Sequence, residues 1–246
     1  MSNIIGKEFM FKTKYKFLEA PDQRKGLPQP PYQLEYDESL RIIDLPKPDI
    51  IKISDVNLRE VIEGRKSVRK YSEETITLLE LSWLLWSTQG VREIYQNSIT
   101  MRNVPSAGAR HAFETYLLIN NVEGLKTGIY RFLAFEHKLI EINIDKKIAD
   151  KVVTAVLNQK FIKNSATTFI WTAVPYRMTW RYSQRGYRYL HIDAGHVCQN
   201  LYLAAANINC GVCAIAAFND EELNDLLEID GENQFVIYLA TVGKKE

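Results

Sequence analysis

The sequence of 246 residues has a formal net charge of +1, 46% hydrophobic residues and 25% charged residues. This balance suits a globular protein with a sizeable core, and it gives no sign of a nucleic-acid-binding surface. No apolar run reaches the roughly 20 residues of a membrane span, and Met1 to Lys16 lack the apolar stretch of an export signal. The three cysteines indicate a reducing compartment rather than a disulfide framework. We therefore expect a cytoplasmic protein that binds neither nucleic acid nor membrane.

The first 58 residues are predicted to form an arm docked on another part of the protein. Five prolines between positions 28 and 48 interrupt regular elements. Apolar side chains between Tyr32 and Leu45 supply anchors, which a freely disordered segment would lack. An arm of this length often lies across a partner subunit. Residues 59–246 are then the main domain.

A basic segment follows a short predicted helix at 57–63, which has Asn57 as its N-cap. In extended geometry Arg65, Ser67 and Arg69 point to the same face, because side chains alternate along a strand. Two guanidiniums beside a hydroxyl can hold a phosphate group through paired hydrogen bonds. The alternative interpretation is a solvated basic turn.

Residues 77–89 are predicted to form a buried helix. Thr77 and Glu80 have the spacing of a capping box, and Gly90 ends the apolar run. The two tryptophans of this helix are interpreted as core residues.

The central loop, residues 102–111, comes next in the predicted order. Pro105 and Gly108 favour a tight connection. Ser106 lies between Arg102 and Arg110, so the loop suits an anionic planar ligand. An ordinary polar loop is the alternative.

The remaining pattern mixes strands with helices, which is typical of an α+β protein. Predicted strands are 113–119, a hairpin of 128–133 and 138–144, 167–174, 211–218 and 235–242. Predicted helices are 145–157, 178–207 and 221–227. The first half of 178–207 is rich in aromatic residues and arginines that could stack on a ligand or form a structural face. Its second half is small and apolar, as at a domain centre or a dimer seam.

Three other motifs favour structural roles. Cys210 and Cys213 have dithiol spacing but lie before a strand, so they are interpreted as buried residues. The four histidines do not have the spacing of a zinc site, and no metal is expected. Ser106 and His111 could form a hydrolytic pair, but no third member is evident.

Four blocks together resemble the FMN-dependent nitroreductase family, and more closely its SagB-type dehydrogenase branch, which includes azoline oxidases. The blocks are Arg65–Arg69, Pro105–Tyr116, Trp180–Gly195 and Gly211–Phe218. The resemblance implies a nitroreductase-like fold with a central, mostly antiparallel sheet flanked by helices. It also implies an interlocked homodimer with FMN at the interface.

The resemblance further implies roles for individual residues. Arg65, Ser67 and Arg69 would hold the phosphate and ribityl chain, with Lys244 as a weaker candidate. The loop, from the other subunit, would lie against the isoalloxazine. The expected cofactor-binding residues there are Pro105, Ser106, Ala107, Gly108 and Arg110, with Ala214, Ile215 and Ala216 on the opposite ring region.

The sequence departs from the family pattern at two positions. Ala109 stands where many relatives carry asparagine. Arg181-Tyr182 stands where azoline oxidases are similar in having a Lys-Tyr pair. Arginine stays protonated and is a poor base, whereas Tyr182 could act as an acid or base. Arg181 and Tyr182 are therefore the candidate catalytic residues.

The leading hypothesis is an FMN oxidoreductase that transfers hydride through flavin N5. Its substrate would be a quinone- or nitro-like molecule, or a thiazoline or oxazoline in a modified peptide, with NAD(P)H as a candidate donor. A non-catalytic flavin-binding or scaffold subunit of a peptide-modifying complex is the alternative. A hydrolase that uses Ser106 is a third hypothesis.

Overall fold

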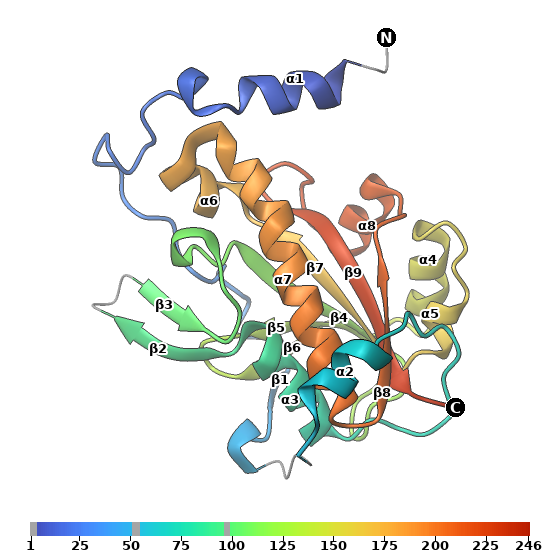
Figure 1. Cartoon of the computed structure of the whole chain (residues 1–246). Helices are drawn as coiled ribbons and strands as arrows, with labels where there is room; N and C mark the ends of the chain where they lie inside the picture. Colours follow the sequence, from blue (N-terminus) through green and yellow to red (C-terminus); the bar gives the residue numbers. More distant parts are fainter. Residues whose placement is uncertain (1–3, 51–54, 96–98) are drawn as a thin grey trace.

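A seven-stranded sheet runs through the centre of the computed structural model, which describes residues 4–50, 55–95 and 99–246. The strand order is β1-β6-β5-β4-β7-β9-β8, and every neighbouring pair is antiparallel (Figure 1). The strands are β1 (Ile42–Asp44), β4 (Phe113–Ile119), β5 (Gly128–Leu133), β6 (Lys138–Asn143), β7 (Thr167–Ala173), β8 (Cys210–Ile215) and β9 (Phe235–Lys244). The predicted α+β class with an antiparallel sheet is confirmed.

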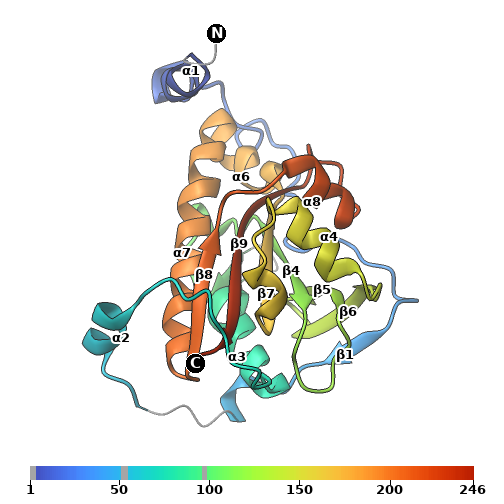
Figure 2. The same cartoon turned by 90° about the vertical axis from the view of Figure 1, so that its right-hand side faces the viewer.

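Helices cover both faces of the sheet. The helices are α1 (Ile5–Lys12), α2 (Leu58–Gly64), α3 (Leu78–Gln89), α4 (Ile148–Ala155), α5 (Phe161–Asn164), α6 (Pro175–Tyr182), α7 (Gly186–Ala206) and α8 (Asp220–Leu226), of which α1 lies apart from the sheet. Figure 2 shows the sheet between α3 and α7 on one side and α4 and α8 on the other. No helix in the described ranges is long and apolar enough to cross a membrane.

The alternation of side chains along β4 divides the core into two clusters. Leu117 and Ile119 pack in the cluster below α3 and α7. Tyr116 and Leu118 pack in the cluster below α4 and α8. Every residue of β4 is buried, because both faces of this central strand are covered.

The predicted helix starts at Asn57 and Thr77 are confirmed. The Thr77 side chain accepts a hydrogen bond from the Glu80 amide, and Glu80 bonds back to the Thr77 amide, so the capping box is formed. Asn57 caps α2 by accepting from the Arg59 amide. These short-range hydrogen bonds depend only on neighbouring residues, which explains why the sequence predicts them.

Two predicted helices differ from the structure, and one hairpin was not predicted. The helix expected at 178–207 is two helices, because Ser183 has a positive φ of 50° and a short 3-10 turn separates α6 from α7. The helix expected at 145–157 is confined to α4. Between α3 and the central loop lies an unpredicted hairpin of β2 (Val91–Tyr95) and β3 (Ile99–Arg102).

The N-terminal arm contains regular elements, contrary to the prediction made from its prolines. It begins with α1, and its strand β1 pairs with β6 at the edge of the sheet. The prolines precede and follow β1, so they leave its ladder hydrogen bonds intact.

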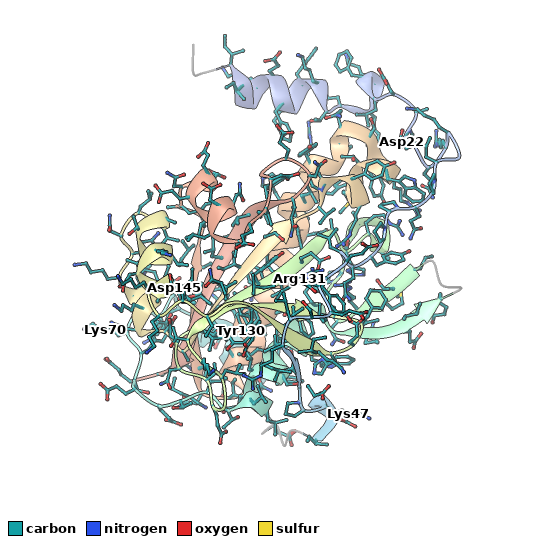
Figure 3. All side chains as sticks on the ribbon, turned by 180° about the vertical axis from the view of Figure 1, so that it is seen from behind. Asp22, Lys47, Lys70, Tyr130, Arg131 and Asp145 are labelled. Carbon is teal, nitrogen blue, oxygen red and sulfur yellow. The ribbon has the colours of Figure 1, made fainter. Side chains whose placement is uncertain are left out.

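The arm is held on its own chain by buried charges. Arg131 donates to the carbonyls of Leu34 and Glu35, and Arg177 donates to that of Pro31. Glu114 pairs with both arginines and accepts from the Leu34 amide. Seen from behind in Figure 3, Arg131 lies near the centre of the molecule.

Candidate functional site

The segment after α2 runs along the open edge of β8. The Val68 amide donates to the Val212 carbonyl over 2.9 Å, and Ser67 pairs with Val212 in a parallel bridge. The Ser72 amide donates to the Lys244 carbonyl over 3.0 Å. We refer to residues 65–69 as the clamp.

Two glycines allow the clamp to approach the sheet closely. A Cβ atom on Gly211 would lie 2.6 Å from the Val68 Cβ, and one on Gly243 would lie 2.7 Å from the Tyr71 ring. The Tyr71 hydroxyl donates to the Val68 carbonyl over 2.6 Å. Val68 and Tyr71 thus anchor the clamp on the sheet.

The three predicted phosphate ligands of the clamp are exposed. The Arg65 guanidinium lies 5.5 Å from the ring centroid of Tyr202, and that of Arg69 lies 5.9 Å from that of Phe161. Neither arginine forms an ion pair with any residue that the structure describes. Arg65 also lines a cavity of about 510 Å³. Asp55 and Glu60 also line this cavity, whereas Ser67 and Arg69 do not. Each guanidinium can still bind an anion, but Tyr202 and Phe161, over which they lie, pack against different core clusters, so the two are not on one face as predicted.

Lys244 has a different environment from the one predicted. Its ammonium group is buried, 2.5 Å from a Glu80 carboxylate oxygen, and donates to the Ile208 carbonyl. Burial alone would lower the pKa of Lys244, but Glu80 outweighs it, so the net shift is upward. Lys245 lines the cavity beside Arg65 instead. Alternation at the end of β9 could have indicated that residue 245 takes the outward position.

The central loop is tied to α7. The Ala107 amide donates to both carboxylate oxygens of Asp193, over 3.2 and 3.3 Å. Burial raises the pKa of Asp193, while hydrogen bonds from Ser106 and Ala107 act in the opposite direction. Sequence reasoning did not identify Asp193, which is 86 positions from Ala107.

Gly108 meets the candidate catalytic pair. Its φ is +57°, and a Cβ there would lie 2.4 Å from the Tyr182 hydroxyl oxygen and 3.0 Å from Arg181. The Tyr182 ring packs edge-on against Tyr189, with 4.9 Å between centroids. Arg181 and Tyr182 line a cavity of about 520 Å³, part of which is formed by residues 15–24 of the arm. The structure therefore brings the loop and the predicted catalytic pair together.

The arginines that flank the loop point inward. Arg110 is buried and donates to the Gly108 carbonyl over 3.1 Å and to the Tyr32 hydroxyl over 3.3 Å. Arg102 is buried and donates to Gln89. Both side chains support the loop and the arm from within, so their charge is not presented at the loop surface as expected.

The end of β8 lies beside the clamp. The Ala214 amide donates to the Tyr202 hydroxyl over 3.0 Å, and that hydroxyl lies 3.5 Å from the Ser67 hydroxyl. The Ile215 side chain is buried in the second core cluster, whereas Ala216 is exposed. Ile215 as a whole is only 3% exposed, so Ala216 is the exposed member of the three residues predicted to contact the ring system.

The clamp and the loop are separate on a single chain. The clamp contacts α7 at Tyr202, and the loop contacts it at Asp193, nine residues earlier. That separation corresponds to about 14 Å of helix. No hydrogen bond or ion pair links the two groups among the described residues.

The environment of Cys210 and Cys213 does not support a redox-active dithiol. Cys198, Cys210 and Cys213 are buried, and burial raises the pKa of Cys210 to about 12. A thiol with that pKa is a poor nucleophile at neutral pH.

The hydrolase alternative also lacks its predicted histidine base. The Ser106 hydroxyl accepts from the backbone amide of His111, not from its ring. Burial, together with Arg102, lowers the pKa of the His111 imidazole to about 3.

The antiparallel sheet flanked by helices is a nitroreductase-like fold. The model of the nitroreductase family matches residues 62–244, so the chain belongs to that family.

Individual relatives agree with this assignment. A Methanocaldococcus jannaschii protein named for the nitroreductases is 34% identical over 78% of this chain and 93% of its own length. The trifolitoxin-processing protein TfxB of Rhizobium leguminosarum is 33% identical over 54% of this chain and 37% of its own length. A nitroreductase-type structure from Anabaena variabilis is 27% identical with a TM-score of 0.69, covering 85% of this chain and 42% of that chain.

Proposed function

We propose that this chain is an FMN-dependent oxidoreductase that passes hydride through flavin N5 at the interface of a homodimer. Residues 1–58 are the docked arm, and residues 59–246 are the FMN-binding domain. The observation that carries the proposal is the clamp: Arg65, Ser67 and Arg69 are exposed, and neither arginine has an ion-pair partner in the part of the chain that the structure describes, in a protein of an oxidoreductase family.

The clamp suits the phosphate of a flavin nucleotide. Each guanidinium can donate paired hydrogen bonds to phosphate oxygens, and the Ser67 hydroxyl adds another donor. Lys245 adds positive charge to the cavity that Arg65 lines. FMN supplies the hydride chemistry when bound, and the chain binds and orients it.

The loop and the end of β8 would hold the ring system. The segment from Pro105 to Gly108 can approach a planar ligand closely beside Tyr182, because Gly108 has no side chain. Exposed backbone around Ala216 can supply amide donors to the region where negative charge develops on reduction.

A second copy would bring the loop to the clamp. The two groups are about 14 Å apart along α7 on one chain, and in the proposed dimer the loop of the second protomer lies against the clamp. The exposed face of α7 is suited to such a contact: Ile192 is 54% exposed, and a Cβ on Gly195 would meet nothing within 4 Å.

Tyr182 is the residue proposed to move a proton to or from the substrate. Arg181 stays protonated and would orient an anionic or carbonyl-bearing group beside it. Substrates of two kinds fit this arrangement, a small organic acceptor and a peptide heterocycle, and NAD(P)H is the proposed donor. The likeness to a trifolitoxin-processing protein supports the peptide class.

A second candidate function is a non-catalytic flavin-binding subunit of a peptide-modifying complex. Arg181, in place of a lysine that could act as a base, favours it. Flavin bands that a nicotinamide bleaches anaerobically, and that an acceptor restores, would support the enzyme. Tight FMN binding without reoxidation by any acceptor would support the scaffold.

Substitution of Arg65 tests the clamp. Arg65→Ala removes a charge-assisted contact worth about 1.5–3 kcal/mol, so FMN affinity should fall at least about tenfold. The measurement is flavin content after purification and FMN titration of the flavin-free protein.

Arg59→Ala is the matched control for that substitution. Arg59 lies on α2, is exposed and pairs with Glu63, and its loss should leave flavin retention unchanged. Equal flavin occupancy in the Arg65 and Arg59 variants would refute the clamp assignment.

A further inference from the structure

Tyr202 connects three separate segments of the chain. It belongs to α7, and its hydroxyl accepts from the Ala214 amide of β8 over 3.0 Å. The same hydroxyl lies 3.5 Å from the Ser67 hydroxyl of the clamp. The Arg65 guanidinium lies over its ring at 5.5 Å. No pattern in the sequence indicated these contacts, because Ser67 and Tyr202 are 135 positions apart.

The ring of Tyr202 holds Arg65 without neutralising it. The face of an aromatic ring attracts a cation through its quadrupole but carries no net charge. Arg65 has no carboxylate partner among the residues that the structure describes, so its charge stays available to a ligand. A long arginine side chain loses rotamer entropy when it is ordered, and the contact with Tyr202 meets part of that cost before any ligand arrives.

We propose that Tyr202 is a positioning residue that aligns Arg65 and Ser67 for the phosphate end of a flavin nucleotide. The inference rests on the proposed function and goes further, because it assigns Tyr202 to the discrimination between FMN and riboflavin. Riboflavin lacks the phosphate, so its binding does not use the alignment that Tyr202 maintains.

The test compares two ligands on the flavin-free full-length protein. FMN and riboflavin are titrated separately, and quenching of flavin fluorescence gives each Kd. In Tyr202→Leu, FMN affinity should fall about two- to fivefold, the range of a cation–π contact near a surface. Riboflavin affinity should stay unchanged, so the ratio of the two affinities should fall by the same factor. Tyr202→Phe keeps the ring and should retain more of the FMN preference than the leucine variant.

Tyr187→Leu is the matched control, since it makes the same change at the other end of α7, about 22 Å away along the helix. It should leave the FMN-to-riboflavin ratio unchanged. A ratio in Tyr202→Leu equal to that of the wild type overturns the proposal. If the leucine variant does not fold, the same criterion applies to Tyr202→Phe, whose lost hydroxyl should lower the ratio. A wild-type protein that binds neither flavin overturns the proposed function itself, which keeps the two failures distinct.

Discussion

At the scale of single residues, His111 shows how burial changes the chemistry that is available to a side chain. The sequence places it beside Ser106 and Arg110, where a hydrolytic base is conceivable. In the structure its ring is buried and its φ is +42°. Burial and then Arg102 lower its pKa to about 3, so it stays neutral. The sequence shows that His111 neighbours Ser106 and Arg110. It does not show that His111 is buried, because that burial depends on the arm and the sheet.

The lowered pKa of His111 predicts a pH-dependent stability. An unfolded histidine binds a proton near pH 6.5 and the folded one does not, so stability is present above pH 6.5 and is lost as the pH falls toward 3. This coupling amounts to about 2 kcal/mol at pH 5. His111→Asn, which tolerates positive φ, should reduce the loss of unfolding free energy between pH 7.5 and pH 5 in urea titrations.

Burial also lowers the pKa of His137. In the His111 variant, His137 therefore still makes the unfolding free energy fall as the pH falls. The exposed His191 provides the comparison: His191→Asn should retain the wild-type slope. A His111 variant with that same slope would contradict the prediction.

At the scale of elements, local patterns predicted most of the sheet. They failed where contacts between distant residues determine the structure. Strands such as 113–119 were predicted correctly because their aromatic and β-branched residues favour extended structure. The break between α6 and α7 was missed, because Ser183 takes a positive φ that its residue type does not indicate. In the proposed site, alternation predicts Arg65, Ser67 and Arg69 as phosphate ligands, whereas Asp193 and Tyr202 make contacts that sequence spacing does not reveal.

The arm depends on one buried carboxylate. Burial raises the pKa of Glu114, but Arg177 and Arg131 outweigh it, so the group stays ionised. Glu114→Gln leaves two buried guanidiniums without a counter-charge, a change that costs about 3–5 kcal/mol. We expect the arm to detach first, seen as faster amide exchange at Leu34, whose amide donates to Glu114.

Glu136→Gln is the control for the arm. Glu136 also contacts the arm, by accepting from Gln33 at the surface, and its loss should change stability by less than about 0.5 kcal/mol. Equal protection of Leu34 in the wild type and in Glu114→Gln would show that the carboxylate does not hold the arm.

At the scale of the whole molecule, the clamp and the loop of a site come either from the same chain or from two chains of a dimer. If each site combines the clamp of one chain with the loop of the other, defects on different chains can complement. A mixed dimer of Arg65→Ala and Gly108→Val has one site with both defects and one with neither. We expect each homodimer to lose flavin and the mixed dimer to retain about one flavin per two chains.

Gly108→Val is suited to this experiment because its φ of +57° strains a β-branched residue and its side chain would meet Tyr182. The measurement is flavin absorbance per chain in mixed dimers purified through two different affinity tags. A mixed dimer as empty as the homodimers would show that clamp and loop serve the same chain's site.

The fit of Val68 over Gly211 and of Tyr71 over Gly243 has a consequence for loading of the protein. These contacts involve only the polypeptide, so the edge that carries the proposed phosphate clamp is assembled before any prosthetic group arrives. Capture of the nucleotide then needs little reorganisation of the backbone. A protein stripped of its flavin should accept a fresh molecule at a rate set by diffusion and docking rather than by refolding of the edge.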